Sequence, residues 1–164
     1  MKEYSTDKIR NVVLASHSGA GKTILCEAFL HATGATTRMG RIEDGTTVSD
    51  FDEEEIRRTI SLSTSVIPVE YRDTKINFLD TPGYTDFIGE VISAMRVVDS
   101  VILMVDAVNG LEVGTEIAMD YCSKFNLPRF LVINKMDRDN ANFQKALKSV
   151  EDFSDVRLIP IQLP

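Results

Sequence analysis

A run of small, polar and charged residues near the start of the chain has the composition and spacing of a phosphate-binding loop. Its members are Ser16, His17, Ser18, Gly19, Ala20, Gly21, Lys22 and Thr23. Small residues let successive backbone N–H groups converge on phosphate oxygens, and a following helix adds the partial positive charge of its N-terminus. In such a loop Lys22 reaches the β- and γ-phosphates, and the Thr23 hydroxyl binds Mg²⁺.

The first two positions of this loop, Ser16 and His17, are not explained by the usual pattern. The usual pattern begins with glycine, and this chain has Ser16 in its place. His17 has no partner that the sequence identifies, so a structural role is favoured over a catalytic one. The alternative, a serine- and glycine-rich turn that precedes a helix by chance, is disfavoured because the motif lies between an apolar strand pattern and a helical one.

A second short motif, Asp80-Thr81-Pro82-Gly83, follows the apolar residues 75–79. An acid at this place holds Mg²⁺ through a water molecule, while the N–H of Gly83 meets the γ-phosphate. The same four residues also make an ordinary turn. Their significance therefore depends on the other motifs.

A third motif, Asn134-Lys135-Met136-Asp137, follows the apolar residues 130–133. The Asp137 carboxylate can accept hydrogen bonds from N1–H and the 2-amino group of guanine, a donor pair that adenine lacks. The amide of Asn134 can support Asp137 and the base, and the alkyl stem of Lys135 can cover the ring. The order of the three motifs favours a guanine nucleotide and argues against an ATP-dependent kinase.

Alternating strand and helix patterns must position these motifs. Apolar, β-branched stretches predict strands at residues 11–15, 63–71, 75–79, 101–105 and 130–133, and helical periodicity marks residues 22–33, 86–98, 115–125 and 142–153. This alternation predicts an α/β fold with a mostly parallel sheet covered by helices on both faces. Residues 63–71 and 75–79 read as an antiparallel hairpin, in which Pro68 indicates an edge strand. Ligands of such sheets bind at the carboxyl ends of the strands.

Residues 34–60 interrupt this order with a long polar segment that shows no helical stripe. Loops of this length inside a compact domain are usually functional or mobile. Residues 50–55 (DFDEEE) are strongly acidic, and a solvated charge run is at least as good an explanation as a specific role.

Composition limits the class of protein. The 164 residues include 25 Asp and Glu against 18 Lys and Arg, a formal charge of −7, which disfavours DNA wrapping by phosphate neutralisation. Cys26 and Cys122 lack metal-site or disulfide spacing and are expected to be reduced and buried. No signal-peptide core and no run of about 18 apolar residues occurs, so a soluble, cytoplasmic protein without a membrane partner is expected. A monomer is also expected.

Five segments, in order SHSGAGKT, RRTISLSTS, DTPGYTDF, VDAVNGLEVGTE and NKMDRDNANF, resemble the G domain of translational GTPases, most closely the elongation factor G-like group. The resemblance implies a P-loop NTPase fold that binds GTP or GDP with Mg²⁺, hydrolyses GTP, and acts in translation with the ribosome as partner. It leaves the translation step open among translocation, recycling, release and ribosome protection. The alternative is a GTP-gated ribosome-binding module with little hydrolysis.

The resemblance also implies roles for single residues. Ser61 aligns with the family threonine that closes on Mg²⁺ and γ-phosphate, and Thr59 remains a second candidate. Thr23, Ser61 and Asp80 are thus the expected metal residues, and Lys22, Gly83 and Tyr84 the expected catalytic ones.

Departures from the family pattern affect hydrolysis more than binding. Tyr84 replaces a histidine that orients the attacking water, and Gly19 replaces an aspartate linked to a monovalent cation. A phenol, with an ordinary pKa of about 10, is a poor base near neutral pH. Slow hydrolysis without ribosomes is therefore expected.

The last residues, 156–163 (VRLIPIQL), predict the start of another strand. The family's fifth guanine-contacting loop finds no match in the chain. We therefore expect residues 1–164 to be an incomplete N-terminal G domain that binds nucleotide weakly on its own.

Overall fold

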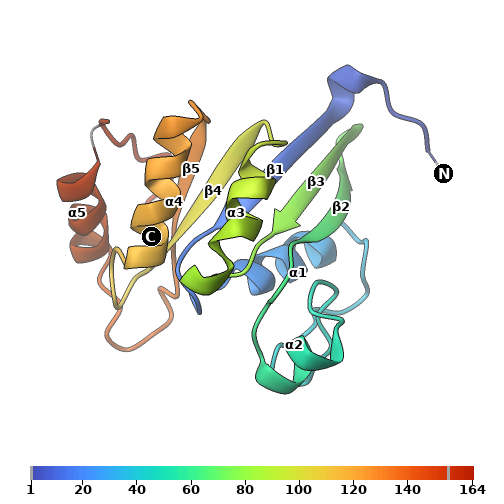
Figure 1. Cartoon of the computed structure of the whole chain (residues 1–164), viewed down its shortest axis with the longest axis horizontal. Coiled ribbons are helices and arrows are strands. Elements are labelled where there is room, and N and C mark those ends of the chain that lie inside the picture. Colours follow the sequence, from blue (N-terminus) through green and yellow to red (C-terminus); the bar gives the residue numbers. More distant parts are fainter. Residues whose placement is uncertain (1, 155) are drawn as a thin grey trace.

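The computed structural model describes residues 2–154 and 156–164, which form one twisted sheet with helices on both sides (Figure 1). The chain order is a 3-10 turn Thr6–Lys8, β1 Ile9–Ala15, α1 Lys22–Ala32, α2 Glu53–Arg58, β2 Ser65–Tyr71, β3 Thr74–Asp80, a 3-10 turn Thr85–Phe87, α3 Ile88–Met95, β4 Ser100–Asp106, α4 Val113–Lys124, β5 Arg129–Asn134 and α5 Phe143–Phe153. Within the described residues, no helix is long and apolar enough to cross a membrane.

The strand order is β2-β3-β1-β4-β5, and every neighbouring pair is parallel except β2 with β3. The predicted α/β fold, a mostly parallel sheet with one antiparallel hairpin strand, is therefore confirmed. Pro68 lies in β2 at the edge of the sheet, where its missing N–H costs the sheet little.

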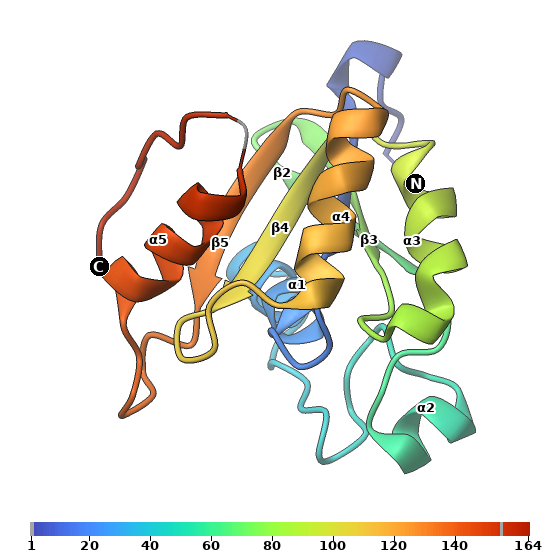
Figure 2. The same cartoon turned by 60° about the vertical axis from the view of Figure 1, so that its left-hand side comes forward.

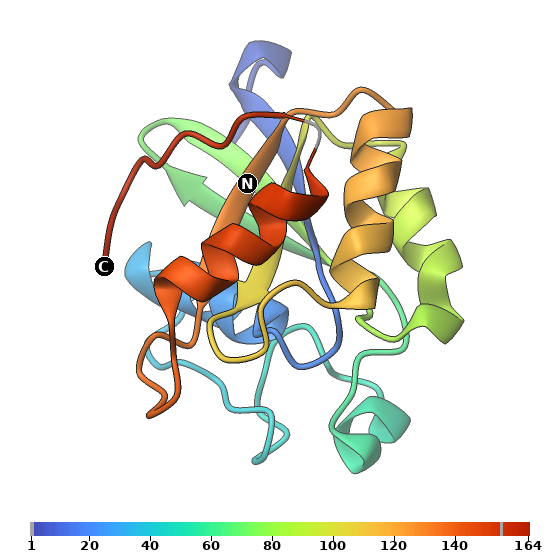
Figure 3. The same ribbon diagram turned by 90° about the vertical axis from the view of Figure 1, so that its left-hand side faces the viewer.

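Alternate residues of the central strands face two separate cores. Val13 and Ala15 of β1 join the core beneath α3, α4 and α5, whereas Leu14 joins the core beneath α1. Figures 2 and 3 show these three helices on one face of the sheet and α1 on the other. Because both faces are covered, the central strands are apolar at nearly every position, which is why the sequence shows unbroken apolar runs.

The helix predicted at residues 86–98 is shorter in the structure. A 3-10 turn at Thr85–Phe87 precedes α3, which ends at Met95. The residues that follow leave the helix because Asp99 pairs with Asn11 at the start of the sheet: the Asp99 N–H donates to the Asn11 carbonyl at 2.8 Å, and the Asn11 N–H donates to the Asp99 carboxylate at 2.7 Å.

The long segment at residues 34–60 is not entirely irregular, which corrects the expectation. It contains the short helix α2, because Asp52 accepts a hydrogen bond from the Glu54 N–H and forms a capping box with Glu55. The Glu55 side chain is buried, so the acidic run is not uniformly solvated.

The strand expected at residues 156–163 is also absent from the described residues. This stretch is irregular, with Ile159 80% and Ile161 82% exposed. An extended apolar run becomes a strand only when its backbone pairs, and no described strand pairs with it.

Candidate nucleotide-binding site

The phosphate-loop motif connects the carboxyl end of β1 to the first turn of α1. Gly19 and Gly21 adopt left-handed backbone angles, with φ of 77° and 104°. A Cβ at Gly21 would also lie 2.3 Å from the Asn134 amide nitrogen. Glycine is therefore required at position 21 for two reasons, its backbone angle and its close approach to the third motif.

The Lys22 ammonium group points back into this loop. It is buried and donates to the Ser16 hydroxyl at 3.1 Å and to the carbonyls of Ser16 and His17 at 3.4 and 3.3 Å. Burial lowers the pKa of the Lys22 amine to about 8. Its direct hydrogen-bond partners are all neutral oxygens, so phosphate oxygens would give this buried cation a charged partner.

Thr23 and Asp80 bring the first and second motifs into direct contact. The Thr23 hydroxyl donates to Asp80 Oδ2 at 2.7 Å, while Asp80 Oδ1 is buried and has no hydrogen-bond partner among the described residues. Burial raises the pKa of Asp80 to about 6. A hydroxyl and an unpartnered carboxylate oxygen are ligands that Mg²⁺ accepts, so these residues fit the ion.

Gly83 brings the second motif against the phosphate loop. A Cβ at Gly83 would lie 2.6 Å from both Lys22 Nζ and Ser18 Cα, so the backbone can approach the loop this closely only without a side chain. Tyr84, 43% exposed, borders a small hollow together with Ser16 and Pro82. The three predicted catalytic residues, Lys22, Gly83 and Tyr84, therefore lie around the same loop.

Asp50 also belongs to this region, although no motif in the sequence marks it. Its carboxylate is buried and accepts a hydrogen bond from the Ser61 hydroxyl at 2.8 Å. Thr59 is exposed, and its hydroxyl donates to the Arg58 carbonyl. Of the two candidates for the metal hydroxyl, only Ser61 is held next to a buried carboxylate. No signal in the acidic run distinguished Asp50 from exposed acids such as Asp52 and Glu53.

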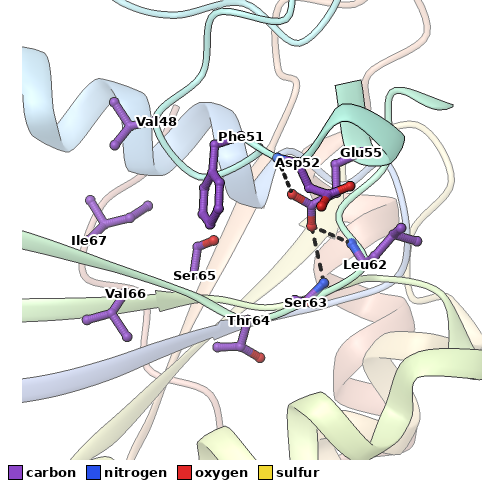
Figure 4. A pocket seen from close by; sticks show the side chains of 10 residues that line it. All are labelled: Val48, Phe51, Asp52, Glu55, Leu62, Ser63, Thr64, Ser65, Val66 and Ile67. Atoms are coloured by element: carbon purple, nitrogen blue, oxygen red, sulfur yellow. Dashed lines mark hydrogen bonds between the residues drawn. The ribbon is translucent and has the colours of Figure 1, made fainter. Parts of the chain in front are cut away.

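A cavity of about 400 Å³ lies between residues 48–55 and the start of β2, apart from the phosphate loop (Figure 4). Glu55 borders it and accepts hydrogen bonds from the N–H groups of Leu62 and Ser63 at 2.9 and 3.2 Å. The helix α2 thereby fixes the chain directly after Ser61.

The third motif reaches the loop through Asn134, whose amide donates to the Ala20 carbonyl at 2.9 Å. Lys135 donates to Asp106 at the end of β4, a contact that no sequence motif indicates. Met136 and Asp137 are exposed.

His17 has two hydrogen-bond partners in α4 that the sequence did not reveal. Its N–H donates to the Thr115 hydroxyl at 3.0 Å, and its Nδ1 accepts from the Gly114 N–H at 3.3 Å. These bonds tie the phosphate loop to the start of α4.

Comparison with known proteins gives a consistent family. Residues 7–159 match the family described as elongation factor Tu GTP binding domain. Elongation factor G of Granulibacter bethesdensis is 35% identical over the whole chain, which covers 24% of that protein. An elongation factor G-like protein of Mycobacterium tuberculosis is 40% identical over 95% of the chain, which covers 22% of the relative. The chain thus spans about a quarter of the length of these relatives.

Solved structures agree with the architecture. A Thermus thermophilus protein of 38% identity superposes with a TM-score of 0.84 over 88% of this chain and 22% of its own. Translation elongation factor SelB from Methanococcus maripaludis, solved with a GTP analogue, is 22% identical, has a TM-score of 0.65 and matches 93% of this chain and 26% of its own; at this identity it supports the fold alone. The chain belongs to the elongation factor Tu GTP-binding domain family and is an elongation factor G-like G domain of the translational GTPases.

Proposed function

We propose that this chain binds GTP and GDP with Mg²⁺ and hydrolyses GTP as the switch domain of an elongation factor G-like protein. One observation carries the proposal: three motifs that are distant in sequence meet at the carboxyl ends of the strands. Thr23 bonds Asp80, Asn134 bonds Ala20, and Gly83 lies against Lys22. This is where ligands bind in sheets of this kind.

In this proposal the phosphate loop, residues 16–23, surrounds the phosphates. Thr23 and Ser61 would hold Mg²⁺ through their hydroxyls, and Asp80 would hold it through its carboxylate. The ion, when bound, neutralises charge on the β- and γ-phosphates. Lys22 contributes a second positive charge from within the loop, and the Gly83 N–H detects the γ-phosphate. Asp137 selects guanine through its N1–H and 2-amino donors.

Hydrolysis in this proposal is slow until a partner positions the water. Tyr84 is exposed beside the loop, and its hydroxyl makes no hydrogen bond to the described residues. A phenol can orient water but is a weak base at neutral pH. The full natural protein is therefore expected to work on the ribosome, where a ribosomal contact positions the attacking water. In this proposal it acts in the cytoplasm and as a monomer.

A second candidate is a GTP-gated ribosome-binding module in which hydrolysis is incidental. Two residues favour it: Tyr84 where the family has histidine, and Gly19 where it has an aspartate. Both candidates require the same nucleotide site. They differ in whether ribosomes accelerate turnover.

Single-turnover phosphate release by the full natural protein, with and without ribosomes, separates the two candidates. The GTPase proposal expects a low rate alone and an increase of at least about tenfold on ribosomes, because positioning and charge stabilisation dominate phosphoryl transfer. Tyr84→Phe should lower the stimulated rate and Tyr84→His should raise it. An unstimulated rate on ribosomes would favour the binding module, and equal rates in both variants would remove Tyr84 from the mechanism.

A further inference from the structure

The carboxylate of Asp106 serves two loops at once. Asp106 lies at the end of β4 and is 4% exposed as a residue. Its Oδ1 accepts hydrogen bonds from the N–H groups of Val108 and Asn109, at 2.8 and 3.4 Å, and its Oδ2 accepts from Lys135 Nζ at 2.7 Å. One oxygen therefore shapes the loop before α4, and the other holds the lysine of the guanine motif.

The backbone places this pair beside the nucleotide site. Asp106 and Asn134 are register partners in the parallel ladder between β4 and β5, and the Ala107 N–H donates to the Asn134 carbonyl at 2.9 Å. Asn134 in turn bonds the Ala20 carbonyl of the phosphate loop. Lys135 is the next residue. The side chain that Asp106 holds therefore lies one residue away from the Asn134 contact to the phosphate loop.

Lys135 needs such support for two reasons. Its backbone adopts a left-handed conformation, with φ of 61°, which is costly for a residue with a side chain. Its side chain is 29% exposed, and a lysine stem loses much rotamer freedom when it is fixed. If the stem is already oriented in the free protein, less side-chain entropy is lost when a ligand binds.

The charge state of Asp106 suits this task. Its burial works against the ionised form, but Lys135 and the two backbone N–H groups outweigh burial and hold the pKa of Asp106 below its ordinary value. The carboxylate is thus charged throughout the neutral range, and the pair with Lys135 persists.

We propose that Asp106 is a positioning residue for guanine-nucleotide binding, which holds the alkyl stem of Lys135 in the place where the base lands. The inference rests on the proposed function and deepens it. Asp106 does not touch the nucleotide; it acts through Lys135. Loss of its charge should weaken nucleotide binding and speed release without touching any phosphate or metal contact.

A double-mutant cycle on the full natural protein tests this, with a fluorescent GDP analogue as probe. Asp106→Asn keeps one oxygen for the backbone N–H groups and removes the charge that faces Lys135. Lys135→Met keeps the stem and removes the ammonium group. Each single change should weaken affinity roughly tenfold, and the double variant should be no weaker than Lys135→Met alone. Asp106→Glu, which keeps a carboxylate, should recover part of the loss.

The matched control is Asp152→Asn, which breaks the exposed Lys148–Asp152 pair on α5 and should leave affinity unchanged. If Asp106 were only structural, Asp106→Asn would weaken affinity equally with and without Lys135, and the additive cycle would overturn the inference while the proposed function stood. If the unmodified protein failed to bind the GDP analogue, both would be overturned.

Discussion

Asp137 is the residue on which the choice of base depends in the proposed function. It is exposed in the loop after β5, and no hydrogen bond or ion pair joins its carboxylate to the described residues. Xanthine carries a 2-oxo group where guanine has its 2-amino group. Asp137→Asn would place an amide donor opposite this group and remove the charged acceptor for guanine.

We therefore expect Asp137→Asn to weaken GDP binding about 10- to 100-fold, since hydrogen bonds to charged groups contribute roughly 1.5–3 kcal/mol. Binding of xanthosine diphosphate should improve. Displacement of a fluorescent GDP analogue by each nucleotide measures both. Asp139→Asn, an exposed acid two residues further on, is the control and should change neither affinity. Unaltered preference in Asp137→Asn would contradict the assignment.

The site residues divide into those that the sequence predicted and those that it could not. Thr23, Asp80 and Asn134 belong to short motifs whose local pattern shows their chemistry, and the structure brings these motifs together. Asp50 and Asp106 belong to no such motif. Their importance comes from burial and from partners at residues 61 and 135, which only the tertiary structure brings near.

At the scale of elements, α1 does more than extend the phosphate loop. Glu27 lies on this helix, is 1% exposed, and accepts hydrogen bonds from the N–H groups of Gly40 and Val48 at 2.7 and 2.6 Å. One carboxylate thus anchors both ends of the chain segment 40–48. The segment leads directly to Asp50. A loss of order in residues 40–48 would therefore also disturb the position of Asp50.

Glu27→Gln should loosen this segment, because an amide offers one acceptor oxygen where the carboxylate offers two. The buried N–H left without a partner costs about 1–3 kcal/mol, which raises the open population roughly 5- to 150-fold. Trypsin cleavage after Arg38 and Arg41, both exposed near the segment, should accelerate accordingly.

Glu43→Gln, in the same segment but exposed, supplies the comparison and should cleave at the original rate. Cleavage of Glu27→Gln at that same original rate would show that the segment is held by other contacts. A similar acceleration at sites across the whole molecule would instead indicate global destabilisation.

The elements themselves were predictable where a long periodic pattern supported them. The five strands and four of the helices follow apolar runs and stripes, because burial on two faces of the sheet dictates those patterns. The short helix α2 was missed although Asp52 and Glu55 have capping-box spacing, since a charge run hid that signal. Residues 156–163 were misassigned because apolar composition alone cannot supply a pairing partner.

At the scale of the whole molecule, three buried charged side chains lie together at the carboxyl ends of the strands. Lys22, Asp50 and Asp80 are all less than a tenth exposed. Burial disfavours the charged form of each side chain. It therefore lowers the pKa of Lys22 and raises the pKa values of Asp50 and Asp80. Buried charges that lack full compensation oppose folding, so a ligand that compensates them should stabilise the whole chain.

Addition of GDP and Mg²⁺ should therefore raise the melting temperature. At a free ligand concentration of a hundred times Kd, binding adds about 2.7 kcal/mol, which for a chain of this size corresponds to roughly 5–10 °C. A chelator should remove the part of the gain that depends on Mg²⁺, and Asp80→Asn should reduce that same part.

ATP with Mg²⁺ is the matched ligand control and should give little gain, because adenine offers Asp137 no N1–H and 2-amino pair. An equal gain with ATP would show that the phosphate loop binds without the third motif, and no gain with GDP would contradict the proposed site as a whole.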